Sequence, residues 1–509
     1  MTITYAKSVN LYGMLEIVCK GKADGNPFVD YSIYASIVGA DKVIVKGFYD
    51  GDGTYKVRFM PQKKGEYAFQ VYGSFSDETA EGSFVVENAA ERNHGMVSVA
   101  KQYHFAYADG TPYYSIGTTC YVWHLQSEEK KQETLENLVK SGFNKIRFCV
   151  FPKHYAYNLS EPPCYPFEGM PMDSSVLTME NFNDYNGCAE GNDWDFSRFQ
   201  PQYFHNIEDC IEKLRDRGVE ADIILFHPYD RWGFSMLTRE QSRHYLEYGV
   251  ARFSAYSNVW WSLANEYDLM PNRTADDWHF YAKVIMDNDP YGHLRSIHNC
   301  MGFFDHSAEW ITHCSIQRQD VYKTVEYTDE WRRQYGKPVV LDEISYEGNI
   351  PYGWGNIMAE EMVRRFWETA CRGGYAGHGE TYLHDTSDIW WSHGGTLYGE
   401  SCARMKFLHK IMSETPSHGL KAGSGLWDEV MAVPEDDKVF EETGYRLYYY
   451  SFMRPSYREY SLDDGCEYEV EIIDTWNMTI DYVGRFRGKF KLEMPSKQYM
   501  AVRMRKAGK

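Results

Sequence analysis

The sequence predicts a multidomain α/β protein: a (β/α)8 TIM barrel flanked by an N-terminal Ig-like β-sandwich and a small C-terminal β-sandwich. Apolar runs alternate with amphipathic helical segments through the middle of the chain, as repeated βα units require. Both ends instead carry short alternating strand patterns broken by turn residues. A length of 509 residues is also too great for one ordinary core. We place the domain boundaries at 1–90, 91–420 and 421–509.

The first domain is predicted from strand patterns alone. Turn signals lie between the strands, among them the Asn-Pro pair at 26–27 and the Asp-Gly-Asp-Gly run at 50–53. That run resembles the first half of a calcium loop, but no glutamate occupies loop position 12, so a hairpin turn is favoured. The predicted strands are 28–37, 42–48, 54–59, 67–72 and 82–86.

The barrel is predicted from apolar runs that each precede an amphipathic segment. The runs are 113–118, 145–150, 220–226, 259–264, 294–298, 311–316, 338–342 and 374–377. The helical segments include 128–141, 203–217, 239–254, 275–287 and 359–371. A long loop at 155–197 follows the second run, where it should lie at the catalytic face of a barrel.

The last domain follows a predicted helix at 403–412. Its alternating pattern indicates a small β-sandwich. The predicted strands are 445–450, 468–473, 489–492 and 499–504.

Composition narrows the classes of partner. A net charge of −20 would repel nucleic acid, and no basic run offsets it, so a neutral carbohydrate suits the chain better. Aromatic residues make up 16% of the chain, which permits stacking on sugars but is explained equally well by core packing. No segment has the pattern of a signal peptide or a membrane helix, and the 11 cysteines form no C-x-x-C pair. We expect a cytoplasmic protein with no membrane partner; a homo-oligomer is left open.

Two glutamates end barrel strands that lie on opposite sides of the predicted barrel. The fourth run ends in Asn265-Glu266, and the seventh ends in Asp342-Glu343. Functional side chains of such barrels sit at the carboxyl ends of strands. Hydrolysis of a glycosidic bond with retention needs two carboxyl groups, one as proton donor and one as nucleophile. Asp342 should point to the other side of its strand and Glu347 lies a turn further on, so Glu343 is favoured.

This arrangement resembles the retaining glycosidases of the clan A type, which carry their catalytic glutamates on barrel strands four and seven. The resemblance implies that Glu266 is the general acid/base and Glu343 the nucleophile. It also implies that Asn265 holds the 2-hydroxyl of the sugar and that Arg147 keeps the nucleophile ionised. A guanidinium beside a carboxylate lowers its pKa, which a nucleophile requires.

A closer resemblance is to apiosidase-like barrel proteins with an N-terminal β-sandwich and a C-terminal β domain. It rests on the Glu-x-x-Tyr-Glu-Gly motif at 343–348, the Gly-His pair at 377–378 and the Asp-Ile-Trp-Trp run at 388–391. Motifs at 26–28, 47–51, 58–61, 104–112 and 473–478 extend it over nearly the whole chain. The glutamate after Asn265 and the large loop at 155–197 depart from characterised apiosidases, which leaves the sugar open.

Other polar and aromatic residues follow the predicted strands and are candidates for binding the sugar. Short polar side chains can hydrogen-bond hydroxyl groups, and tryptophan offers a stacking face. The candidates are Arg147, His227, Trp232, Asn265, His298, Asn299, Gln317, Tyr346, His378, Glu380 and Trp390.

The sequence gives no metal-binding pattern. His227, His298, His313 and His378 could converge on one ion, but no His-x-His or His-Glu-x-x-His spacing supports this, so we expect no metal and no organic cofactor. The predicted function is a retaining hydrolase that cleaves a β-glycoside by double displacement, with exo action on small oligosaccharides. A non-catalytic carbohydrate-binding barrel and an inverting glycosidase are the alternatives. The sugar, the linkage and the roles of the β domains stay open.

Overall fold

A closed parallel barrel forms the centre of the protein. The structure, a computed structural model, describes residues 2–187, 189–318, 320, 322–384, 388–424 and 429–508. Eight parallel strands pair in the order β19-β18-β17-β14-β13-β23-β21-β20, and a parallel bridge between His298 and Ser315 joins the two end strands. The barrel prediction is therefore confirmed. The strands are β13 (Gly117–Thr119), β14 (Lys145–Cys149), β17 (Glu220–Phe226), β18 (Val259–Ala264), β19 (Arg295–Ser296), β20 (Cys314–Gln317), β21 (Val339–Glu343) and β23 (Tyr375–His378).

Helices surround this sheet, and local sequence signals set their ends. Ser127 caps the first barrel helix, which stops at Gly142 in the left-handed conformation. Thr238 and Thr274 each begin a helix with a capping box. The helices are α2 (Glu128–Ser141), α3 (Pro201–Arg215), α4 (Arg239–Phe253), α5 (Ala275–Asn288), α6 (Thr328–Tyr335), α7 (Ala359–Cys371), α8 (Trp390–His393) and α9 (Ser401–Ser413).

A small antiparallel sheet covers the end of the barrel where its strands begin. It contains β10 (Val97–Ala100), β11 (His104–Tyr107) and β12 (Pro112–Tyr113). Its apolar side chains form one core with the first residues of several barrel strands, among them Trp260 and Tyr375. The predicted first strand, 113–118, is displaced for this reason: Tyr113 pairs with β11, and the barrel strand starts at Gly117.

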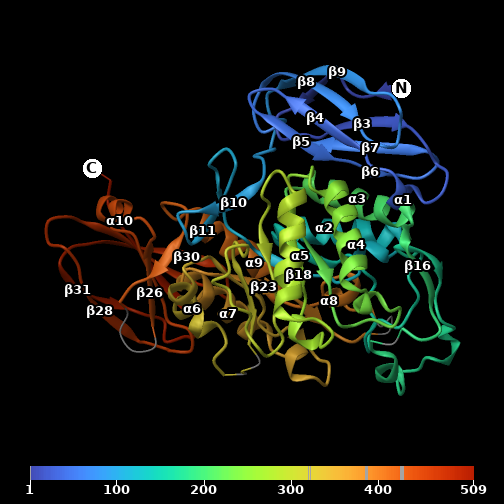
Figure 1. Cartoon of the computed structure of the whole chain (residues 1–509). Helices are drawn as coiled ribbons and strands as arrows, with labels where there is room; N and C mark the ends of the chain where they lie inside the picture. Colours follow the sequence, from blue (N-terminus) through green and yellow to red (C-terminus); the bar gives the residue numbers. More distant parts are fainter. Residues whose placement is uncertain are drawn as a thin grey trace.

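The N-terminal domain is a sandwich of two sheets that lies against one end of the barrel (Figure 1). One sheet contains β1 (Ile3–Thr4), β3 (Leu15–Lys20), β7 (Thr54–Phe59) and β6 (Phe48–Tyr49). The other contains β2 (Ser8–Asn10), β9 (Ala80–Glu87), β8 (Gly65–Tyr72), β4 (Tyr34–Val38) and β5 (Lys42–Lys46). The predicted strand 28–37 is shorter than expected because Asn26 caps a one-turn helix, α1 (Pro27–Asp30), with proline at its first position.

Buried ion pairs fix this domain to the barrel. Arg252 on α4 contacts Asp50 at 2.7 Å and Glu208 at 2.6 Å. Arg58 on β7 contacts Glu208 at 2.7 Å from the other side. The Asp-Gly-Asp-Gly run at 50–53 is therefore a hairpin turn between β6 and β7, and its first carboxylate pairs with arginine and lysine side chains.

The C-terminal domain packs beside the barrel (Figure 1). Its larger sheet contains β25 (Leu420–Ala422), β26 (Val430–Pro434), β27 (Arg446–Tyr449), β32 (Met500–Lys506), β29 (Tyr468–Asp474) and β30 (Thr479–Phe486). Its smaller sheet pairs β28 (Tyr457–Ser461) with β31 (Lys489–Glu493). A short helix, α10 (Asp437–Thr443), lies between β26 and β27. A separate apolar core that includes Val470 and Val502 holds the two sheets together.

The long loop after β14 has structure of its own. β15 (Phe167–Met170) and β16 (Asp193–Phe199) form an antiparallel pair within it, and Phe167 packs on Phe199 and Phe234. Throughout the described ranges, the helices are too short or too polar to cross a bilayer.

Candidate active site

Glu266 lies two residues beyond β18 in an unusual backbone conformation. Its φ of 49° and ψ of 55° lie in the left-handed region, which non-glycine residues adopt at some cost and often at functional sites. Gln317 Nε2 donates to Glu266 Oε1 at 2.7 Å, and the hydroxyl of Tyr229 donates to Oε2. Burial, and then the negative charge of Glu343, raise the pKa of the Glu266 carboxyl. A raised pKa favours the protonated form of this carboxyl and suits a proton donor.

Glu343 ends β21 and faces three donors. Its Oε1 accepts from the hydroxyl of Tyr121 at 2.5 Å and from Arg147 Nη1 at 3.2 Å, and His298 Nε2 lies 3.4 Å away. Burial opposes ionisation, but the contacts with His298, Arg147 and Tyr121 outweigh it and lower the pKa of Glu343 to about 2. This carboxyl is therefore ionised over the physiological range, as a nucleophile must be.

A buried charge cluster lies next to this pair inside the barrel. Lys145 Nζ contacts Asp222 at 2.8 Å and Asp342 at 2.7 Å, and all three side chains are almost fully buried. Ser315 Oγ donates to Asp342 and is bonded to His298 Nδ1 at 3.0 Å, so the cluster orients the histidine that faces Glu343. The carboxylate of Asp342, the neighbour of Glu343, is therefore paired with Lys145.

Aromatic rings and one lysine connect the two glutamates. Lys153 is 2% exposed, and its Nζ lies 3.4 Å from the ring centre of Tyr121, 4.3 Å from that of Tyr229 and 4.4 Å from that of Trp391. Tyr121 bonds Glu343 and Tyr229 bonds Glu266. Burial lowers the pKa of Lys153 to about 8. The ammonium group is held mainly by ring faces, which stabilise a desolvated cation.

The structure brings several more of the predicted binding residues to this pair. The side-chain oxygen of Asn265 lies 3.2 Å from the hydroxyl of Tyr121, which donates to Glu343. The amide of Asn299 donates to the carbonyl of Gln317 at 2.9 Å and so positions the side chain that bonds Glu266. Tyr346 is buried and packs on Trp391, with ring centres 6.5 Å apart, and burial and the charge of Glu343 raise the pKa of its hydroxyl. The residues gathered here are Arg147, Asn265, Glu266, His298, Asn299, Gln317, Glu343 and Tyr346.

Five predicted binding residues have other partners within the protein, away from the hydrogen bonds of the two glutamates. His227 is buried and bonded to the carbonyl of Phe151 at 3.3 Å. Trp232 is buried and donates to Glu161 at 3.1 Å, within the long loop after β14. Trp390 donates to Thr118 at 2.8 Å, so it packs inside the barrel wall rather than forming a platform. The remaining two are His378 and Glu380.

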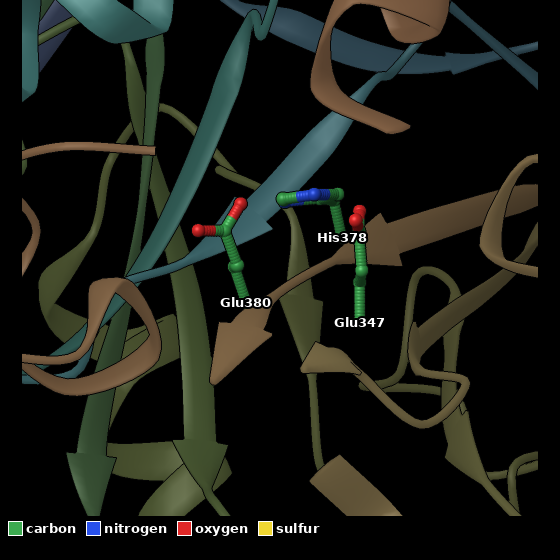
Figure 2. A group of neighbouring side chains, drawn as sticks. All are labelled: Glu347, His378 and Glu380. Atoms are coloured by element: carbon green, nitrogen blue, oxygen red, sulfur yellow. The ribbon is translucent and has the colours of Figure 1, made fainter. Parts of the chain in front are cut away.

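His378 and Glu380 form a buried cluster with Glu347 (Figure 2). One potential ligand atom from each residue lies within 4.8 Å of the others, a spacing that suits a metal ion. The carboxylates, however, already accept backbone N–H groups: Glu347 from residues 400 and 401, and Glu380 from residues 398 and 399. His378 is bonded to Thr118 and Ser401, at 3.2 Å each. These hydrogen bonds indicate that the cluster fixes the start of α9.

Sequence reasoning missed two residues that complete the site. Tyr121 lies two residues beyond β13, and Lys153 lies four residues beyond β14. Their positions after barrel strands were a usable signal, since such positions face the mouth. Neither residue belongs to a motif, and only the packing of the loops turns both toward the glutamates.

A closed (β/α)8 barrel with two glutamates of opposite pKa shift after strands four and seven is the arrangement of a glycoside hydrolase, and the comparisons with known proteins show this class. The chain belongs to the apiosidase-like family, whose catalytic-domain model matches residues 99–434. Models for two domains of unknown function, DUF5060 and DUF5605, match residues 8–74 and 427–505. No curated protein sequence matches the chain.

Solved structures agree with the family assignment. A protein from Bacteroides vulgatus ATCC 8482, assigned to the glycoside hydrolases, is 35% identical, with a TM-score of 0.89 over 99% of this chain and 100% of that one. A second structure, described as a glycoside hydrolase, is 15% identical, with a TM-score of 0.58 over 82% of this chain and 98% of that one. The second likeness concerns the fold alone.

Proposed function

We propose that the protein is a retaining glycosidase that cleaves a β-glycosidic bond by double displacement. The observation that carries the proposal is the opposite pKa shift of two carboxyl groups that influence each other, with the pKa of Glu266 raised and that of Glu343 lowered to about 2. Pairs of acids whose environments separate their pKa values are typical of acid/base and nucleophile assignments. The β configuration rests on the resemblance to clan A glycosidases.

In the first step, a carboxylate oxygen of Glu343 attacks the anomeric carbon of the bound sugar. The bond from that carbon to the glycosidic oxygen breaks, and Glu266 transfers its proton to the departing oxygen. In the second step, the ionised Glu266 removes a proton from water, and the water oxygen attacks the anomeric carbon. Glu343 leaves as a carboxylate, and the sugar is released with its original configuration.

Neighbouring residues support both steps. Arg147 and the hydroxyl of Tyr121 fix the attacking oxygen of Glu343, so little reorganisation precedes attack. Gln317 and Tyr229 orient the carboxyl of Glu266. By the family resemblance, Asn265 would hold the 2-hydroxyl of the sugar. All of these steps use side chains of this chain and water.

Exo action on small oligosaccharides is the second part of the proposal. The rings of Tyr155, Trp354 and Trp391 pack on one another, with centres 5.0–6.3 Å apart, and Trp391 packs on Tyr121 beside Glu343. This aromatic wall next to Glu343 would limit the space on the nucleophile side to one sugar residue, which supports exo action. A cytoplasmic location, predicted from the sequence, would supply small imported oligosaccharides as substrates.

A screen with nitrophenyl glycosides tests the proposal, followed by proton NMR of the first anomer formed from the best substrate. We expect turnover with retention. Glu266→Ala and Glu343→Ala should fold normally, as judged by circular dichroism, and lose several orders of magnitude in kcat. Azide should restore turnover of Glu343→Ala and yield a glycosyl azide of inverted configuration. An inverted first product would favour a single displacement, and a chain without turnover would be a binding protein.

A further inference from the structure

A hollow of about 430 Å³ lies between the loops that follow β19 and β20. Met301, Phe303, Arg318 and Asp320 line it. Its size is within the usual range for small-ligand sites in proteins. Met301 is 69% exposed, so the hollow is open to solvent. Its two walls come from the loops after β19 and β20, and each wall is tied to Glu266.

The first wall is fixed to the turn that follows Glu266. The carboxylate of Asp268 accepts from the backbone N–H of Cys300 at 2.6 Å and from those of Met301 and Gly302 at 2.8 Å each. Asp268 lies two residues after Glu266, so these bonds hold Cys300 close to the acid/base; burial and the Glu266 carboxyl raise the pKa of the Cys300 thiol. Met301 is therefore the next residue outward from the reacting centre.

The second wall continues from Gln317, whose amide donates to Glu266 Oε1 at 2.7 Å. Arg318 and Asp320 follow it and form an ion pair at 3.4 Å, with side chains about one-third exposed. The guanidinium of Arg318 also lies over the ring of Tyr327, 4.2 Å from its centre. An ion pair this long and this exposed contributes little to stability, so both groups can turn to a ligand at small cost.

We propose that this hollow is the aglycone subsite and that it binds the sugar residue on the leaving-group side of the scissile bond. The subsite proposal rests on the function proposed above, because a leaving group lies beside Glu266 only if Glu266 is the proton donor. Glu266 must hydrogen-bond the glycosidic oxygen, so the aglycone begins within a few ångströms of that carboxyl. Its walls begin one residue beyond Cys300, which is bonded to Asp268 in the turn after Glu266, and one residue beyond Gln317, which is bonded to Glu266 itself.

The lining matches the two kinds of surface that a sugar presents. Met301 and Phe303 offer an apolar surface for the C–H face of a sugar ring. Arg318 supplies donors and Asp320 supplies acceptors for neighbouring hydroxyl groups. Arg318 is therefore the residue that sets preference for a polar aglycone over an apolar one.

Two substrates with the same glycone test the subsite: a disaccharide whose non-reducing sugar is the one selected by the nitrophenyl screen, and the glycosyl fluoride of that sugar. Fluoride leaves without occupying the hollow. Arg318→Ala should lower kcat/KM for the disaccharide by about ten- to a hundredfold, the effect of one lost hydrogen bond from a charged donor. Met301→Ala should lower it several-fold. Both variants should keep kcat/KM for the fluoride within about twofold of the wild type.

The matched control is Arg333→Ala, which removes an arginine that is 68% exposed and paired with Asp329 on α6. It should leave both substrates unaffected. If Arg318→Ala lowers kcat/KM equally for the disaccharide and the fluoride, or for neither, the subsite proposal is wrong while the hydrolase proposal stands. If the wild-type chain turns over neither substrate, the hydrolase proposal fails, and the subsite proposal fails with it.

Discussion

Replacing Lys153 by methionine should move the alkaline limb of the pH profile to higher pH. The side chain lies between tyrosines that bond the two glutamates, and its charge lowers the pKa of Glu266. Methionine keeps the length and the contacts with the rings but removes the cation. Without the cation, the Glu266 carboxylate is less stable relative to the acid, so its pKa rises. An acid catalyst with a higher pKa stays protonated to higher pH.

The structure sets the size of this shift. Lys153 Nζ lies 4.3 Å from the ring centre of Tyr229, whose hydroxyl bonds Glu266. The carboxylate of Glu266 lies half a ring width and one hydrogen bond beyond that ring centre, so the two charges are no more than about 10 Å apart. At an effective dielectric constant of about 20, the attraction is then about 1.7 kcal/mol or more. This corresponds to a pKa rise of about one unit in Glu266.

The assay is kcat/KM against pH for the best nitrophenyl glycoside, because its alkaline limb reports the acid of the free enzyme. Lys283→Met is the control, since Lys283 is 71% exposed on α5 and pairs only with its helical neighbour Asp287 among the described residues. We expect its profile to match the wild type. An alkaline limb of Lys153→Met that stays in place, or that moves to lower pH, refutes the electrostatic role given to Lys153.

Three further changes have expected outcomes. Tyr121→Phe removes a donor 2.5 Å from Glu343 and should raise the pKa of that carboxyl by about one to two units, seen as an acidic limb of kcat/KM at higher pH; an unmoved limb contradicts this. Burial raises the pKa of Glu380 from 4.5 to about 7, so the folded protein binds this proton more tightly than the unfolded chain does. The stability that the proton contributes below pH 4.5 is therefore lost as the pH rises through about 7. Glu380→Gln should remove this pH-dependent loss of about 3 kcal/mol in the free energy of unfolding, measured by urea denaturation. An unchanged pH dependence would contradict the prediction. Arg252→Met should destabilise the protein by about 3–5 kcal/mol because it strips buried Glu208 and Asp50 of a partner; a change below about 1 kcal/mol would show that the ion pairs matter little.

The periodicity of the sequence was enough to predict the barrel because every βα unit repeats the same buried pattern. The helix at 128–141 was predicted with the bounds that the structure has, since Ser127 and Gly142 mark its ends. The first barrel strand was placed too early, because Tyr113 is equally apolar but pairs with β11. Hydrophobic pattern alone does not say which partner a strand takes.

The candidate site was predictable only where a side chain is set by its own strand. Glu343 ends β21 and Arg147 lies on β14, so their direction follows from the register, whereas Glu266 lies two residues beyond β18. His378 ends strand eight and Glu380 follows it, yet Glu380 accepts the backbone N–H groups of residues 398 and 399, and His378 is bonded to the hydroxyl of Ser401. Such a choice depends on a distant segment, which no local pattern contains.

The account depends on Glu343 forming a covalent bond with the sugar. The most direct measurement is mass spectrometry of the enzyme after reaction with a 2-deoxy-2-fluoro glycoside of the sugar that the screen selects, an analogue that slows the second step more than the first. We expect one added sugar per chain, carried by the peptide that contains Glu343, and turnover that returns as the label is lost. An unlabelled enzyme that still hydrolyses the analogue, or a label on any other residue, would contradict the account.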